Sequence, residues 1–108
     1  MSDFLEKAKE HFSKFGRQEF YIEELQETVY FDPVTLADNK RMVAKSKGNE
    51  HEMAVYCLID KCLDKEGKPV FDVGDKHALM NQIAPDVVRK IFAAIMLSRG
   101  TYEDAEKN

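Results

Sequence analysis

Residues 49–63 read NEHEMAVYCLIDKCL, and their apolar side chains fall on more than one side of a predicted helix. Asn49, with Glu52 three residues later, has the signature of a helix N-cap. The apolar residues that follow are too many for one stripe facing a single neighbour. The sequence therefore predicts a central helix with these apolar positions: Met53, Val55, Tyr56, Cys57, Leu58, Ile59, Cys62 and Leu63.

The segment before this helix predicts a second helix over residues 36–47. Thr35 with Asp38 three residues later resembles a helix start. Gly48 separates the two predicted helices.

Two further helices are predicted downstream, after a turn and a short extended piece over residues 64–71. A short helix over about 75–82 is expected to turn three apolar side chains inward, which are Ala78, Leu79 and Ile83. Pro85 suits the first position of a last helix over 86–98, which Gly100 would cap. A polar tail follows over 101–108.

The N-terminal third predicts one helix and a small strand element. Asp3 and Glu6 resemble a capping box that opens a helix to about Phe15, with Leu5, Ala8, Phe12 and Phe15 on one face. Residues 17–25 and 27–32 are rich in aromatic and β-branched side chains and predict two strands, which a turn can join as a hairpin.

Together these elements predict an α+β fold, a mainly helical single domain with four or five helices and a small antiparallel strand element in the N-terminal third. The domain is expected to span residues 1–100, since 108 residues are close to the commonest domain size and 44% of them are hydrophobic. Two cysteines are too few for a disulfide scaffold, so a reducing compartment is expected.

Charge and hydropathy exclude several classes of function. The net charge of −4 argues against a general nucleic-acid binder, which needs a basic surface. No apolar run is long enough to span a bilayer, and the N-terminus lacks the pattern of a signal peptide. A basic segment with Lys40, Arg41, Lys45 and Lys47 is either a patch for an acidic partner or a solvated helix face.

The sequence contains no constellation of catalytic or metal-binding residues. His11, His51 and His77 lie far apart and lack a second ligand at helical spacing. Cys57 and Cys62 point to different sides of a helix and are interpreted as core residues. With no catalytic triad, acid pair or phosphate-binding glycine loop, we expect neither an enzyme nor a cofactor or metal site.

The aromatic residues offer candidates for a binding surface. Most of the aromatic side chains between residues 12 and 31 are expected in the core, but one or two of them can serve as partner anchors. Phe12 and Phe15 on the first helix, with Tyr21 nearby, are the candidate partner-binding residues. The alternative is that all three fill the core.

Four segments in order resemble a known family. They are residues 3–9 (DFLEKAK), 28–38 (TVYFDPVTLAD), 62–71 (CLDKEGKPVF), and the two predicted helices over 78–95. Their order and spacing resemble the tail assembly chaperones of bacteriophages with long, non-contractile tails. The resemblance spans nearly the whole chain, and it rests on structural motifs rather than on catalytic ones.

The resemblance implies a binding role in the host cytoplasm. Such chaperones bind and solubilise the tape measure protein, help tail tube subunits assemble around it, and are absent from the mature virion. Many copies along one client make self-association an expectation. The family also commonly makes a longer, frameshifted product that recruits the tail tube protein. Residues 106–108 (EKN) are compatible with a run of A bases in the gene, so this chain is expected to be the shorter product.

Two other functions compete with this one. A small phage structural or head–tail connector subunit would be retained in the particle, unlike a chaperone. A small hydrolase is a weaker alternative, because the sequence contains no set of reactive residues.

Overall fold

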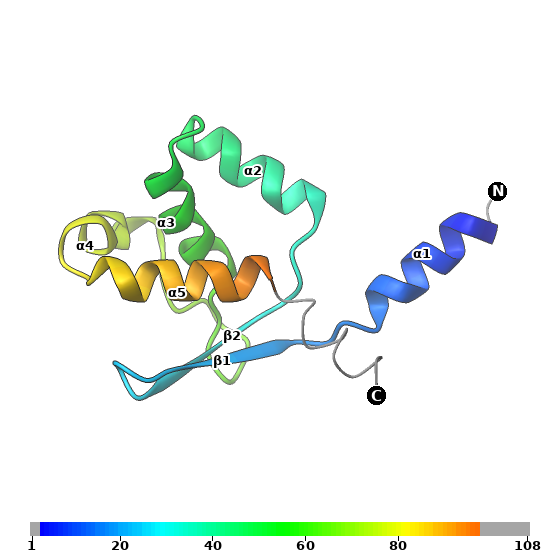
Figure 1. The fold of residues 1–108 in the computed structure, drawn as a ribbon, viewed down its shortest axis with the longest axis horizontal. Helices are drawn as coiled ribbons and strands as arrows, with labels where there is room; N and C mark the ends of the chain where they lie inside the picture. Colours follow the sequence, from blue (N-terminus) through cyan, green and yellow to red (C-terminus); the bar gives the residue numbers. More distant parts are fainter. Residues whose placement is uncertain (1–2, 98–108) are drawn as a thin grey trace.

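The structure, a computed structural model, describes residues 3–97 and has the predicted α+β fold (Figure 1). In chain order the elements are α1 (Asp3–Ser13), β1 (Gln18–Ile22), β2 (Glu27–Phe31), α2 (Leu36–Ser46), α3 (Glu50–Lys61), a 3-10 turn (Val73–Asp75), α4 (Lys76–Asn81) and α5 (Pro85–Met96). The predicted helix end at Ser98, its cap at Gly100 and the tail 101–108 lie outside the described residues.

Helix α3 is the centre of the domain, as its sequence predicts. It contacts α2, α4 and α5, and α5 in turn packs against β1. Five residues in the middle turns of α3 are buried, namely Ala54, Val55, Cys57, Leu58 and Ile59. Neighbouring helices cover α3 on several sides. Its apolar residues can therefore be buried around the helix and need not lie on one face.

The helix starts follow from local capping. Thr35 accepts a hydrogen bond from the Asp38 amide, and the Asp38 carboxylate accepts one from the Thr35 amide, which forms a capping box at the predicted start of α2. Asn49 caps α3 by accepting from the Glu52 amide. Asp3 is already part of α1, so the cap predicted for that residue is not observed.

The two strands form an antiparallel hairpin in which Gln18 pairs with Phe31 and Ile22 pairs with Glu27. The turn between them ends at Gln26, whose φ is +53°. Leu63 exchanges backbone hydrogen bonds with Tyr30, at 2.9 and 2.7 Å, so the extended piece after α3 lies along β2. This pairing ties the hairpin to the helical body.

The loop after α3 turns at Gly67, which has the positive φ, +85°, that its position in the sequence predicts. A Cβ at this position would lie 2.5 Å from Nη1 of Arg17. Arg17 in turn forms an ion pair with Asp32 at 2.9 Å. The absence of a side chain at Gly67 therefore leaves room for that arginine.

The expectation that most aromatic residues of the first third fill the core is wrong. Of the six between residues 12 and 31, Phe31 is the one that is fully buried, and Phe20 packs partly against the core. Strand alternation turns Tyr21 away from Phe20 and Ile22. The prediction that Ile83 faces inward is also wrong, because it follows the end of α4 and is 38% exposed.

Both cysteines are free and buried, in agreement with their interpretation as core residues. Burial raises the pKa of the Cys57 thiol and of the Cys62 thiol to about 12. A thiol with so high a pKa stays protonated at neutral pH and is a poor nucleophile or metal ligand.

Candidate partner-binding surface

Helix α1 projects away from the body of the domain, to which the segment before β1 joins it (Figure 1). None of its residues is buried. Phe4 is 87% exposed, Leu5 is 55% exposed and Phe12 is 39% exposed. An apolar helix face of this kind, left open to solvent, is characteristic of an interaction surface.

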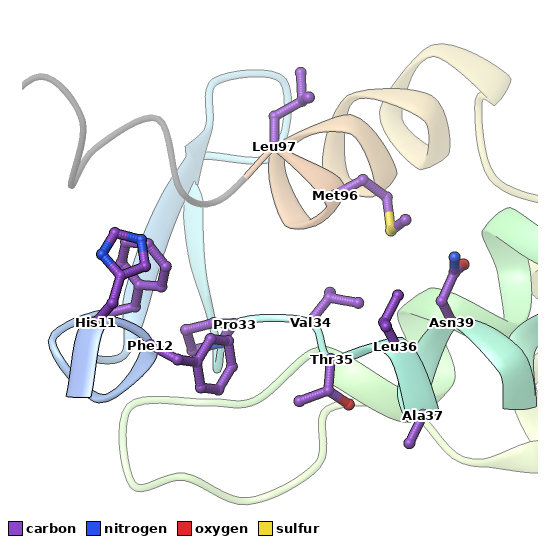
Figure 2. A pocket seen from close by; sticks show the side chains of 11 residues that line it. His11, Phe12, Pro33, Val34, Thr35, Leu36, Ala37, Asn39, Met96 and Leu97 are labelled. Atoms are coloured by element: carbon purple, nitrogen blue, oxygen red, sulfur yellow. The ribbon is translucent and has the colours of Figure 1, made fainter. Parts of the chain in front are cut away.

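The base of α1 contributes to an open groove of about 780 Å³, which we call the end groove (Figure 2). Three segments that are distant in sequence meet there: the end of α1, the start of α2 and the end of α5. The lining residues are His11, Phe12, Phe15, Pro33, Val34, Thr35, Leu36, Ala37, Asn39, Met96 and Leu97. Apolar side chains predominate in this set, so the groove suits an apolar partner.

The side chains of the end groove come toward one another from two sides. In Figure 2, Val34 and Leu36 point toward the end of α5, and Met96 extends from that helix toward them. Leu36 is 88% exposed and Leu97 is 71% exposed, the largest values among the leucines of the described chain. Figure 2 places these two leucines on opposite sides of the groove, Leu36 at the start of α2 and Leu97 at the end of α5, so each side carries an exposed apolar side chain.

Local chemistry explains why Leu36 is held outward. It is the first residue of α2, directly after the Thr35 cap. Asp38 completes the cap and also forms an ion pair with Lys61 of α3 at 2.9 Å, while Arg41 contacts its other oxygen. These contacts fix the start of α2 on the body, and with it the direction of Leu36.

The charge of Asp38 is stabilised where it lies. Burial acts to raise the pKa of this carboxyl, but hydrogen bonds from the Thr35 amide and the Lys61 ammonium outweigh burial, so the pKa lies below its ordinary value. Asp38 therefore remains ionised and paired at neutral pH.

The structure brings two of the three predicted partner-binding residues together. The rings of Phe12 and Phe15 stand edge to face with centroids 5.9 Å apart, and both line the end groove. Tyr21 is 56% exposed on β1 and does not line the groove. The alternative that all three fill the core is wrong for Phe12 and Tyr21, which are exposed.

Sequence reasoning missed Val34, Leu36, Met96 and Leu97. For Leu36 the sequence did offer a signal, which is its place directly after the Thr35 cap. The first residue of a helix lies at its end, outside the turns that pack against a neighbour, so an apolar side chain there can stay exposed. No signal was available for Met96, which packs partly against the core, or for Leu97, which is exposed, because their place in the groove depends on what faces the end of α5.

The basic segment has the character of a solvated helix face. Lys45 forms an ion pair with Asp60 of α3 at 3.1 Å, and Arg41 pairs with Asp38. Two of the four basic residues are therefore in contact with carboxylates of the same chain, as expected of a solvated helix face.

Residues 3–97 contain no group of three or more His, Cys, Asp or Glu side chains that could hold a metal ion. No helix in this range is long and apolar enough to cross a membrane. In a comparison with known proteins, no family model, curated protein or solved structure matches the chain. The candidate function therefore rests on the sequence resemblance and on the end groove.

Proposed function

We propose that this chain is a bacteriophage tail assembly chaperone that binds the tape measure protein in the host cytoplasm. It keeps this client soluble, helps tail tube subunits to assemble around it, and leaves before the virion is mature. The observation that carries the proposal is the end groove, an open apolar surface beside a helix that buries none of its own residues.

The groove fits the physical demands of such a client. A long helical protein with an exposed apolar face aggregates unless a partner covers that face. Val34, Leu36 and Leu97 offer apolar surface on the body, and Phe12 extends this surface onto α1. The net charge of −4 would keep the complex in solution while the apolar surfaces are covered.

The proposal carries no chemical step. Both thiols are buried and protonated, and the described residues contain no metal-binding cluster. A binding role requires only an accessible apolar surface, and the end groove provides one.

Co-expression with the tape measure protein tests the proposal. The wild-type chain is expected to keep the client in the soluble fraction and to co-purify with it. The double variant Leu36→Ser, Leu97→Ser is expected to bind about 100-fold more weakly, since burying two leucines contributes about 3 kcal/mol.

A matched control is the double variant Val43→Ser, Val73→Ser, which removes exposed apolar side chains outside the end groove. It should bind like the wild type, and thermal melts should show that both double variants remain folded. A wild-type chain that neither solubilises nor co-purifies with the client would refute the proposal. Stoichiometric presence of the chain in purified virions would instead identify a retained structural or head–tail connector subunit.

A further inference from the structure

A second cavity lies on another side of the domain, between the hairpin, the loop after α3 and helices α4 and α5. We call it the hairpin pocket, and its volume is about 780 Å³. Its floor consists of core residues from five elements, which are Ile22, Val29, Leu58, Leu79, Val87 and Ile91. These six residues are buried, so the floor of the pocket is apolar and the accessible surface lies at its rim.

The rim of the hairpin pocket combines apolar and acidic side chains. Leu25, Val70 and Ile83 are each between 38% and 52% exposed. Glu27, Asp64 and Glu66 also line the pocket, against a single lysine, Lys65. An apolar cavity with an excess of carboxylates at its mouth favours a partner that combines an apolar anchor with positive charge.

Side-chain hydrogen bonds and an ion pair hold the segments around the pocket in place. Asp64 accepts hydrogen bonds from the amides of Glu66 and Lys68, each at 2.9 Å, which fixes the loop. On the other side, Glu24 in the hairpin turn forms an ion pair with Lys90 of α5. Because these segments are already ordered, little conformational entropy is lost when a partner binds.

We infer that the hairpin pocket is a second binding site, whose occupant is a partner helix that inserts a large apolar side chain flanked by lysine or arginine. Leu25, Val70 and Ile83 surround the inserted side chain, and the rim carboxylates contact the flanking cations. The volume is within the range of clefts that bind drug-sized groups, so it can hold a large apolar side chain. This site deepens the proposed function, on which it rests for the identity of the partner, and it would select basic-flanked segments of the client.

The test uses two synthetic helical peptides of about 18 residues, long enough to form a helix. Both carry leucine and phenylalanine along one face, and the flanks carry lysine in one peptide and glutamate in the other. The lysine peptide is expected to bind the wild-type chain at least tenfold more tightly. Added salt should reduce this preference, because it screens exposed charges. Amide chemical shifts should move at the pocket residues.

Charge reversal of the rim identifies the site. The double variant Glu27→Lys, Glu66→Lys should lose the preference for the lysine peptide. The control Glu10→Lys, Glu19→Lys makes the same change in net charge on exposed residues outside the pocket and should keep the preference.

The inference would be overturned by equal affinity for the two peptides, or by a preference that survives reversal of the rim. Binding that is lost in the Leu36→Ser, Leu97→Ser variant but not after rim reversal would also overturn it, by assigning the peptide to the end groove. Because these measurements use no tape measure protein, their failure is distinct from a failure of the proposed function.

Discussion

Replacement of Asp38 by alanine should destabilise the domain far more than its place on the surface of a helix suggests. The Asp38 carboxylate accepts a hydrogen bond from the Thr35 amide at 3.0 Å and contacts the ammonium of Lys61 at 2.9 Å. The side chains of Asp38 and Lys61 are each only 13% exposed. The substitution removes both contacts and leaves a largely buried lysine without this carboxylate.

The expected loss can be worked out from these contacts. The capping hydrogen bond contributes about 1 kcal/mol, and a negative charge in the first turn of a helix contributes about 0.5 kcal/mol. The ion pair with Lys61 lies between an exposed pair, worth less than about 1 kcal/mol, and a fully buried pair, whose disruption costs about 3–5 kcal/mol. We therefore expect Asp38→Ala to lower the free energy of unfolding by about 3 kcal/mol.

Urea unfolding at several pH values provides the assay. Because the pKa of Asp38 is lowered in the folded state, its charge stabilises the fold above the unfolded pKa, and this contribution is lost as the pH falls through the folded value. The difference between the wild type and Asp38→Asn should thus be full at pH 7 and shrink below about pH 4. A difference that stays constant to low pH would refute the electrostatic part of the reasoning.

Asp86 provides the matched control. It also lies in the first turn of a helix, but its side chain is 82% exposed and its partner Arg89 is 65% exposed. Asp86→Ala should cost less than about 0.5 kcal/mol, as expected of an exposed pair. If Asp38→Ala and Asp86→Ala destabilise the domain equally, the claim that Asp38 anchors α2 to α3 is wrong.

Two further predictions concern the cysteines and the glycines. Cys57 and Cys62 should react with a thiol reagent at pH 8 only after unfolding, because both are buried with a pKa of about 12; rapid labelling of the native protein would contradict this. Gly67→Ala and Gly48→Ala should each cost about 1 kcal/mol for the positive φ. Gly67→Ala should cost more in urea unfolding, since its methyl group displaces Arg17 whereas Gly48 faces open space; equal costs would contradict the contact.

The role of Asp38 connects stability with the end groove. The carboxylate that anchors α2 also holds the helix start at which Leu36 is exposed. A variant at Asp38 should therefore weaken client binding as well as stability, whereas the leucine variants should weaken binding alone. Comparing the two kinds of variant distinguishes residues that hold the groove in shape from residues that contact the partner.

Much of the fold was predictable from short stretches of sequence. The caps at Thr35 and Asn49, the burial of α3 and the positive φ of Gly67 were all expected and are all observed. Each depends on interactions between residues a few positions apart, or on the conformational range of a single residue. Because these local interactions do not depend on the rest of the fold, they can be predicted from the segment alone.

The candidate site was predictable only in part. Phe12 and Phe15 were expected as partner anchors, and both line the end groove. Leu36 and Leu97 were not expected there, although they are the most exposed leucines of the described chain. The spacing of apolar residues shows which face of a helix is apolar. It does not show whether another segment of the same chain or a separate protein covers that face.

The sequence by itself determined the identity and order of the helices and strands, the central place of α3 and the chemically inert character of the cysteines. The tertiary structure alone decided that α1 projects from the body, that residues 12, 36 and 97 line one groove, and that buried residues from five elements form the floor of the hairpin pocket. The physical reason is the range of the interactions. Capping and helical periodicity act within one or two turns, whereas exposure depends on which distant segments cover a given face.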